Sequence, residues 1–92
     1  MNYEYSNVEK EGKLWIITLN RPERMNALHS PAHFELEEIF NNFSADPDAW
    51  VAIITGSGDR AFCAGNDLRY QAEGGKMERN PSGFAGLTSR FD

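Results

Sequence analysis

Two glycine-containing stretches follow the apolar run Val51–Thr55, and both have spacings that could place backbone N–H groups against a ligand. The first, residues 56–61, reads Gly-Ser-Gly-Asp-Arg-Ala and matches the G-x-G-x-x-A form of the dinucleotide-binding fingerprint. That fingerprint needs a helix to open at its third position, so that the helix N-terminus meets a pyrophosphate. Residues 62–66 interrupt such a helix. A plain turn is therefore the favoured interpretation, and a nicotinamide or flavin site is the alternative.

The second stretch, residues 61–68, reads Ala-Phe-Cys-Ala-Gly-Asn-Asp-Leu and favours an oxyanion site. Gly65 lets the backbone approach a ligand closely, and a short helix that opens at Asp67 would aim free N–H groups at an incoming carbonyl. Negative charge that develops on a carbonyl oxygen needs two convergent donors, and loss of one costs roughly 2.7–4 kcal/mol of barrier. One donor can be read from this stretch, and a second cannot.

Other side chains with chemical potential receive more ordinary interpretations. Asp67 could be a general base, but a carboxylate at a helix start is more often a cap. Cys63 has no matching histidine motif and is expected to be a small buried hydrophobe rather than a nucleophile. His29 and His33 are four residues apart, yet Ser30-Pro31 places the helix start between them. We expect both histidines at the surface and no metal site.

Carboxylates and aromatic residues of the predicted helix are assigned to its two faces. Three carboxylates are interpreted as a solvated face rather than an acid pair: Glu35, Glu37 and Glu38. Three phenylalanines are interpreted as core rather than a ligand box: Phe34, Phe40 and Phe43. Trp15 and Trp50 are expected to pack against the sheet, and incomplete burial would expose them as an apolar patch.

The elements that must position these residues follow from hydrophobic patterning. Tyr3–Val8 alternates aromatic and polar residues, residues 10–13 supply turn chemistry, and Leu14–Leu19 is rich in branched apolar residues, which together predict a β-hairpin. Ser30 as N-cap, with Pro31 behind it, predicts the start of a helix that ends at residues 46–48.

The predicted helix carries one apolar stripe, with residues at i, i+3, i+4 and i+7: Leu36, Ile39, Phe40 and Phe43. Val51–Thr55 is suited to a buried strand. A helical crossover between Leu14–Leu19 and Val51–Thr55 favours parallel pairing of these strands, with the ligand near their carboxyl ends.

The composition excludes several classes of protein. The 92 residues are 40% hydrophobic and 25% charged with a net charge of −5, which is typical of one small globular domain and gives no general reason to bind nucleic acid. No apolar run approaches the roughly 20 residues that span a bilayer, and the first residues lack a secretion signal. A cytoplasmic protein is therefore expected. Its one cysteine forms neither an intrachain disulfide nor, alone, a zinc site.

Three segments, residues 19–28, 51–56 and 61–68, resemble in order and spacing the N-terminal motifs of the crotonase (enoyl-CoA hydratase/isomerase) superfamily. The resemblance covers about residues 5–75. It implies an α/β fold made of the first ββα turns of a crotonase-type superhelix, incomplete relative to the family. Residues 1–72 would form the N-terminal part of that domain and residues 73–92 a mobile loop, with the family core beyond residue 92 absent.

The same resemblance implies roles for individual residues. Asn66, which follows the Ala-Gly pair, would give its backbone N–H to the thioester oxygen, a role that tolerates any side chain there. Arg24 would pair with a phosphate of CoA, a task that suits the forked guanidinium. The other residues expected along CoA are Met25, Ala27, Ala64, Asp67, Leu68 and Arg69.

The family's second oxyanion donor comes from a Gly-Gly-Gly type segment after the next strand, and its acid/base glutamates also lie further on. Glu73 and Glu78 do not occupy matching positions. The resemblance implies hydration of 2-enoyl-CoA by the full-length form, with this piece alone inactive, no cofactor beyond the CoA of the substrate, and a homotrimer or homohexamer. Two alternatives are a noncatalytic CoA-binding or interaction module and a dinucleotide-binding, Rossmann-like fragment.

Overall fold

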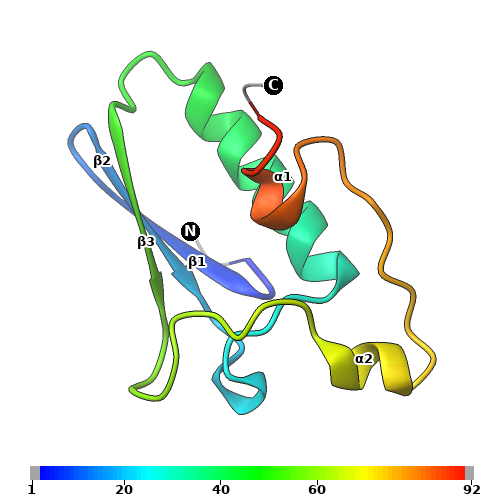
Figure 1. The fold of residues 1–92 in the computed structure, drawn as a ribbon. Helices are drawn as coiled ribbons and strands as arrows, with labels where there is room; N and C mark the ends of the chain where they lie inside the picture. Colours follow the sequence, from blue (N-terminus) through cyan, green and yellow to red (C-terminus); the bar gives the residue numbers. More distant parts are fainter. Residues whose placement is uncertain (1–2, 91–92) are drawn as a thin grey trace.

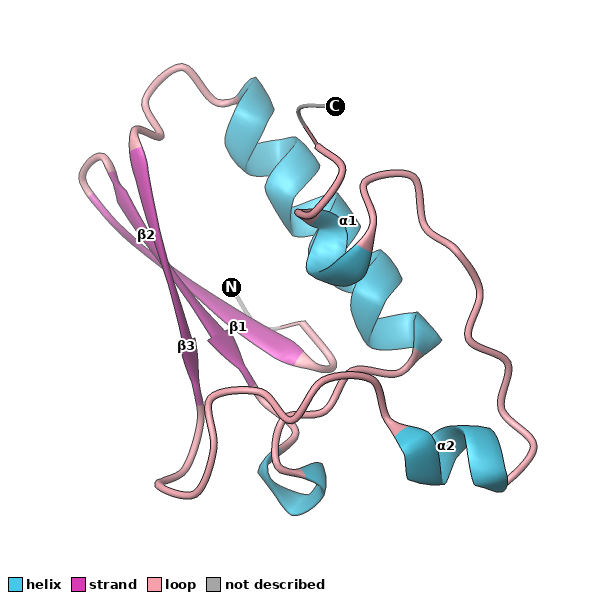
Figure 2. Cartoon of the chain, in the orientation of Figure 1, coloured by secondary structure: helices cyan, strands magenta, loops and turns pink. Residues whose placement is uncertain are grey.

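A three-stranded sheet and one long helix form two layers in the computed structural model, which describes residues 3–90 (Figures 1 and 2). The strands are β1 (Ser6–Glu11), β2 (Leu14–Leu19) and β3 (Val51–Gly56). The helices are α1 (Ser30–Ala45) and α2 (Leu68–Ala72), with 3-10 turns η1 (Pro22–Arg24) and η2 (Phe84–Gly86). The order of elements agrees with the pattern predicted for the first ββα turns of the family fold.

Strands β1 and β2 form the predicted antiparallel hairpin, in a register that pairs Ser6 with Leu19. Its two-residue turn places Gly12 at φ 59°, a conformation that favours glycine. The first strand begins at Ser6 rather than at the predicted Tyr3. The reason is that the Tyr3 N–H donates to the Ser6 carbonyl (3.0 Å) and the Tyr5 N–H to Glu35 Oε2 (2.9 Å), so neither enters the ladder.

Strand β3 pairs with β2 in parallel, which confirms the predicted crossover through α1. The register pairs Leu14 with Val51 and Leu19 with Gly56, so both strands end at the same edge of the sheet. The loops that leave this edge, residues 20–29 and 57–67, therefore start side by side. Both contain the motifs on which the family resemblance depends.

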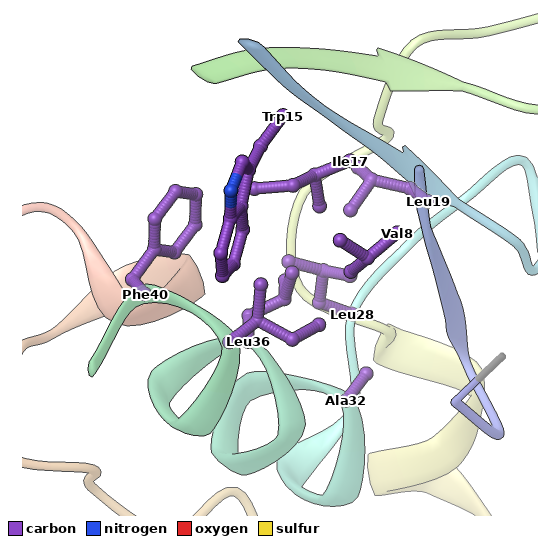
Figure 3. Packing of buried hydrophobic residues seen from close by; sticks show 9 residues of the cluster. Val8, Trp15, Ile17, Leu19, Leu28, Ala32, Leu36 and Phe40 are labelled. Carbon is purple, nitrogen blue, oxygen red and sulfur yellow. The ribbon is translucent and has the colours of Figure 1, made fainter. Parts of the chain in front are cut away.

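The apolar stripe of α1 packs on one face of the hairpin (Figure 3). The fully or nearly fully buried residues of this core are Val8, Trp15, Ile17, Leu19, Leu28, Ala32, Leu36, Ile39 and Phe40. Phe43 is partly buried against them, but Phe34 is 40% exposed and was wrongly assigned to the core. Trp50 is 67% exposed, with Lys13 Nζ 3.7 Å from its ring centre, so only Trp15 packs as expected.

The helix starts at the predicted place with a different cap. His29 is the N-cap residue of α1, and its Nδ1 accepts a hydrogen bond from the Ala32 N–H at 3.3 Å. Ser30 was the predicted cap, but its hydroxyl is used elsewhere: it donates to the Lys76 carbonyl and accepts from the Glu78 N–H, both at 2.6 Å. Ser30 therefore links residues 76–78 to the start of α1 by hydrogen bonds.

Residues 73–90 have little regular structure, yet they include η2, which lies against α1 (Figure 1). Glu37 anchors this segment by accepting from Asn80 Nδ2 (2.9 Å) and the Ser82 N–H (2.8 Å) and by pairing with Arg90 (3.1 Å). Burial alone would raise the pKa of Glu37, but the hydrogen bonds from Ser82 and Asn80 and the charge of Arg90 outweigh it and lower the pKa. The prediction that Glu37 lies on a solvated face is wrong.

Glu35 departs from that prediction too, because it is half-buried and accepts the Glu4 and Tyr5 N–H groups, whereas Glu38 is exposed as expected. Within residues 3–90, no helix combines the length and apolarity needed to cross a membrane.

We expect Leu36→Ala to lower the free energy of unfolding by about 2–5 kcal/mol, because it removes a fully buried side chain from the contact between α1 and the hairpin. Urea unfolding should show a lower midpoint at an unchanged slope. Phe34→Ala on the exposed side of the same helix is the matched control, with an expected change within about 0.5 kcal/mol. Equal effects of the two variants would contradict this assignment of the core.

Candidate functional site

Two loops that are about 40 residues apart in the chain run alongside each other at the carboxyl edge of the sheet. The Ala64 N–H donates to the Met25 carbonyl (3.1 Å), the Leu28 N–H to the Gly65 carbonyl (2.8 Å) and the Asp67 N–H to the Leu28 carbonyl (2.9 Å). These bonds bring the first and third sequence motifs together, and with them the residues predicted to contact CoA.

The backbone N–H of Asn66 is left free by this pairing. Asn66 and Leu28 form an isolated parallel bridge, in which Leu28 bonds to the residues on either side of Asn66. In that geometry the N–H of the central residue points away from the partner strand. No group within residues 3–90 accepts the Asn66 N–H. The predicted oxyanion donor is therefore held by its neighbours, and no hydrogen-bond acceptor in the described part of the chain uses it.

Gly65 is needed here for its conformation. Its φ is +92°, where residues with side chains are strained, and nothing lies within 4 Å of a Cβ built on it. This glycine turns the chain so that the bridge can form.

The buried carboxylate of Asp67 links the two loops through ion pairs. It is 2% exposed, lies 2.9 Å from Arg21 Nη2 and 3.2 Å from Arg24 Nη1, and accepts the Tyr70 N–H at 2.9 Å as the N-cap of α2. Burial alone would raise the pKa of Asp67, but the Tyr70 hydrogen bond and the two arginines outweigh it and lower the pKa. Asp67 is thus the predicted cap, and it stays ionised because it is paired.

Sequence reasoning missed Asn26 as an organising residue. Its Oδ1 accepts the Arg21 N–H (2.9 Å), and its Nδ2 donates to the carbonyls of Ser57 (3.0 Å) and Ala61 (2.9 Å). Asn26 has φ 56°, and asparagine is among the few residues that adopt this region readily. An Asn in a short loop after Arg-Pro was the available signal.

Asn26 also explains the glycine at the start of the dinucleotide-like stretch. A Cβ on Gly56 would lie 2.7 Å from Asn26 Nδ2 and 2.4 Å from the Phe62 carbonyl oxygen, so Gly56 makes room for a polar side chain of the protein itself. No helix opens at Ala61, because residues 57–66 are turns and irregular chain. The stretch thus lacks the helix that the fingerprint requires.

The residues predicted along CoA differ in exposure. Arg24 is partly exposed and reaches from Asp67 toward Glu73 (3.5 Å), whereas Met25, Leu68 and Arg69 are exposed at the rim of the paired loops. Ala64 is exposed and Ala27 is buried, the latter accepting a short hydrogen bond from Arg21 through its carbonyl. Cys63 is partly buried against the core.

Both histidines are buried, so their predicted surface location is wrong. His29 lies between Tyr5 and Tyr70, with ring centres 4.5 and 5.0 Å away. His33 contacts Asn66, with 2.8 Å between Nε2 and Oδ1. Burial lowers the pKa of each ring, and in His29 the charge of Arg21 adds to the effect. Among the described residues, no group of three or more His, Cys, Asp or Glu side chains is placed to hold a metal ion.

Two cavities flank the bridge. One of about 460 Å³ is predominantly polar, and its walls include His33, Asn66, Glu78, Asn80 and Phe84. The other, of about 270 Å³, is apolar, and its walls include Leu28, Phe62, Cys63, Gly65 and Ala85. Asn66 thus lies in the wall of the polar cavity, and its neighbour Gly65 lies in the wall of the apolar one.

We expect Asp67→Asn to lower the free energy of unfolding by about 3–5 kcal/mol at neutral pH, because it leaves the buried Arg21 without its counter-charge. The Asp67 pKa is lowered in the folded protein, so its contribution is present above the unfolded pKa of about 3.9 and is lost as the pH falls through the folded value. Urea titrations at several pH values should show the difference between wild type and variant shrinking below about pH 4.

Glu73→Gln is the control for this prediction. It removes the pairs of the exposed Glu73 with Arg24 and Arg69 but leaves the contacts of Asp67 in place, and surface pairs contribute less than about 1 kcal/mol each. An Asp67→Asn effect as small as that of the control would show that the buried cluster does not hold the loops.

Known proteins share the sequence of this chain over most of its length. The family model for enoyl-CoA hydratase/isomerase matches residues 9–88. Carnitinyl-CoA dehydratase of Citrobacter koseri is 47% identical over 85 residues, which cover 90% of this chain and 32% of the relative. The carnitinyl-CoA dehydratase of Escherichia coli K12 is 44% identical over 91 residues, which cover 97% of this chain and 34% of the relative.

Solved structures show the same fold. The crystal structure of carnitinyl-CoA hydratase from Mycobacterium avium matches with a TM-score of 0.82 and 33% identity, over 92% of this chain and 34% of that one. The structure of enoyl-CoA hydratase from Mycobacterium tuberculosis H37Rv also has a TM-score of 0.82 and 33% identity, over 96% of this chain and 34% of its own. The chain spans about a third of the length of these relatives. Its motifs, its fold and its relatives agree, and the chain belongs to the enoyl-CoA hydratase/isomerase family, the crotonase superfamily.

Proposed function

We propose that this chain supplies the thioester-binding part of an enzyme that hydrates 2-enoyl-CoA or carries out the reverse dehydration. The observation that carries the proposal is the free Asn66 N–H, held in place by hydrogen bonds on both of its flanks. A donor fixed before the substrate arrives stabilises charge on the thioester oxygen without reorganising during the reaction. The resemblance to crotonases assigns this role to the residue after the Ala-Gly pair.

The acyl group that the enzyme takes is proposed from the relatives and from the cavity walls. Two of the relatives are named carnitinyl-CoA dehydratases, and a carnitinyl group is an acyl group with polar substituents. The predominantly polar cavity beside Asn66 supports a similar preference here. We propose that the full protein favours acyl-CoA thioesters with a polar substituent over plain alkyl chains.

Turnover needs groups that the 92 residues do not provide. The sequence contains no Gly-Gly-Gly segment to serve as the second oxyanion donor. Asp67 is committed to Arg21 and Arg24, so it is not available for proton transfer. We therefore propose that this chain alone binds acyl-CoA and does not turn it over. A noncatalytic CoA-binding module is the second candidate function, and the commitment of Asp67 is the observation that favours it.

The remaining expectations are part of the same proposal. CoA would lie along Arg24, Met25, Ala27, Ala64, Asp67, Leu68 and Arg69, with Arg24 on a phosphate. The protein would need no cofactor besides the CoA of its substrate, would work in the cytoplasm, and would assemble as a homotrimer or homohexamer.

We expect Arg24→Ala to weaken acetyl-CoA binding by about tenfold, the equivalent of 1.4 kcal/mol, because it removes a guanidinium from the phosphate end of the site. Isothermal titration calorimetry on this chain measures the change. Arg60→Ala removes an exposed arginine from the neighbouring loop and should leave the affinity unchanged. Arg24→Lys keeps the charge next to Asp67 and separates loss of the phosphate contact from loss of the ion pair.

A thermal-shift comparison tests the class of ligand, since a ligand that binds only the folded state raises the melting temperature. Acetyl-CoA should stabilise the chain and NAD should not. Stabilisation by NAD alone would overturn the proposed function in favour of the dinucleotide-binding alternative.

A further inference from the structure

The side chain of His33 in α1 hydrogen-bonds to two separate segments of the chain, the loop that contains Asn66 and the turn η2. Its Nε2 lies 2.8 Å from Asn66 Oδ1, and its Nδ1 accepts the Ala85 N–H at 2.9 Å. Asn66 belongs to the loop with the free N–H, and Ala85 belongs to η2 in the segment that lies along α1. One side chain of α1 therefore contacts both.

The two contacts fix the tautomer of the ring. Because Nδ1 accepts a backbone N–H, it carries no proton, so the proton of the neutral ring is on Nε2. Nε2 then donates to Asn66 Oδ1. A ring that carried two protons could not accept from Ala85. Both contacts thus require the neutral form.

The side chain of His33 is buried and packed against other residues. It lies in the first turn of α1 and is 4% exposed, and the ring of Phe84 meets it edge-on at 4.8 Å between centres. The charged or titratable neighbours are His29 one turn before it, Glu37 with its partner Arg90 one turn after it, and Glu78 and Arg79 in the wall of the polar cavity.

The bonds of Leu28 and of His33 act on different parts of Asn66. Leu28 fixes the peptide groups on both sides of Asn66, whereas His33 fixes its side-chain amide. The same His33 ring contacts Phe84 and Ala85, so it links the Asn66 wall of the polar cavity to the Phe84 wall.

We propose that His33 is a positioning residue that couples the docking of residues 80–90 on α1 to the placement of Asn66 in the acyl-CoA site. The coupling part of this proposal concerns the chain alone, and its effect on the ligand rests on the proposed function.

Two substitutions separate the two hydrogen bonds. In His33→Gln the amide nitrogen reaches the place of Nε2 and keeps the donor to Asn66, but loses the acceptor for Ala85. In His33→Asn the amide oxygen takes the place of Nδ1 and keeps the acceptor, but loses the donor. His29→Asn is the matched control, because it replaces the other buried histidine, keeps a good N-cap and does not touch Asn66.

The readouts are the NMR signals of Asn66 (backbone and side-chain amide) and of the Ala85 amide, together with acetyl-CoA affinity by calorimetry. His33→Asn should shift the Asn66 signals and weaken acetyl-CoA binding at least about fivefold, the lower end of ordinary coupling between sites. His33→Gln keeps the donor to Asn66 but releases Ala85, so if the two segments are coupled it should shift the Ala85 signal and, with it, the Asn66 signals and the acetyl-CoA affinity. His29→Asn should leave all three readouts in place.

A pH titration of the wild-type chain needs no variant and covers the case in which a variant fails to fold. Asn66 and Ala85 should change with the same midpoint as the His33 ring. Asn66 signals that stay unchanged in His33→Gln, or Asn66 and Ala85 signals that do not follow the His33 titration, would overturn the coupling. If the wild-type chain does not bind acetyl-CoA, the proposed function fails, while the Asn66 and Ala85 signals still decide whether His33 couples the two segments.

Discussion

Asp67 carries its charge at a position that is 2% exposed, held by Arg21, Arg24 and the Tyr70 N–H. An unpaired carboxylate at such a place would be strongly destabilising, so the two loops that carry these partners must come together for the fold to form. The cluster thereby ties the loop after β2 to the loop after β3. Leu28 then bonds to both neighbours of Asn66, and the direction of the Asn66 N–H follows from that bridge.

In the two paired loops, the groups that hold the structure together differ from the group that is free to bind a ligand. Side chains with strong hydrogen-bonding capacity, such as Asp67 and Asn26, are occupied by protein groups, whereas the backbone donor at Asn66 is left free. A donor whose direction is set by its neighbours keeps that direction when the ligand is absent, and this preorganisation is what charge stabilisation at a carbonyl requires.

Part of the apolar surface of β3 is exposed to solvent. Val51 and Ile53 on β3 are exposed, and β3 is the last strand of the described sheet. The relatives are about three times as long. The segment 73–90 packs against α1 through Ser30, Glu37 and His33. Polar contacts with α1, more than regular structure, hold this segment in place.

Local sequence determined the elements and the family. Alternation and β-branching defined the hairpin, the 3.6-residue stripe defined α1, and the crossover predicted parallel pairing of β2 and β3, because these signals arise within short windows. Tertiary structure decided which polar side chains are buried. His29, His33 and Glu37 have no local sequence signal of burial, and each is buried because a segment about 30 to 45 residues away brings it a partner. The Asn66 donor could be named from its motif, but its freedom depends on Leu28, and that pairing exists only once the loops meet.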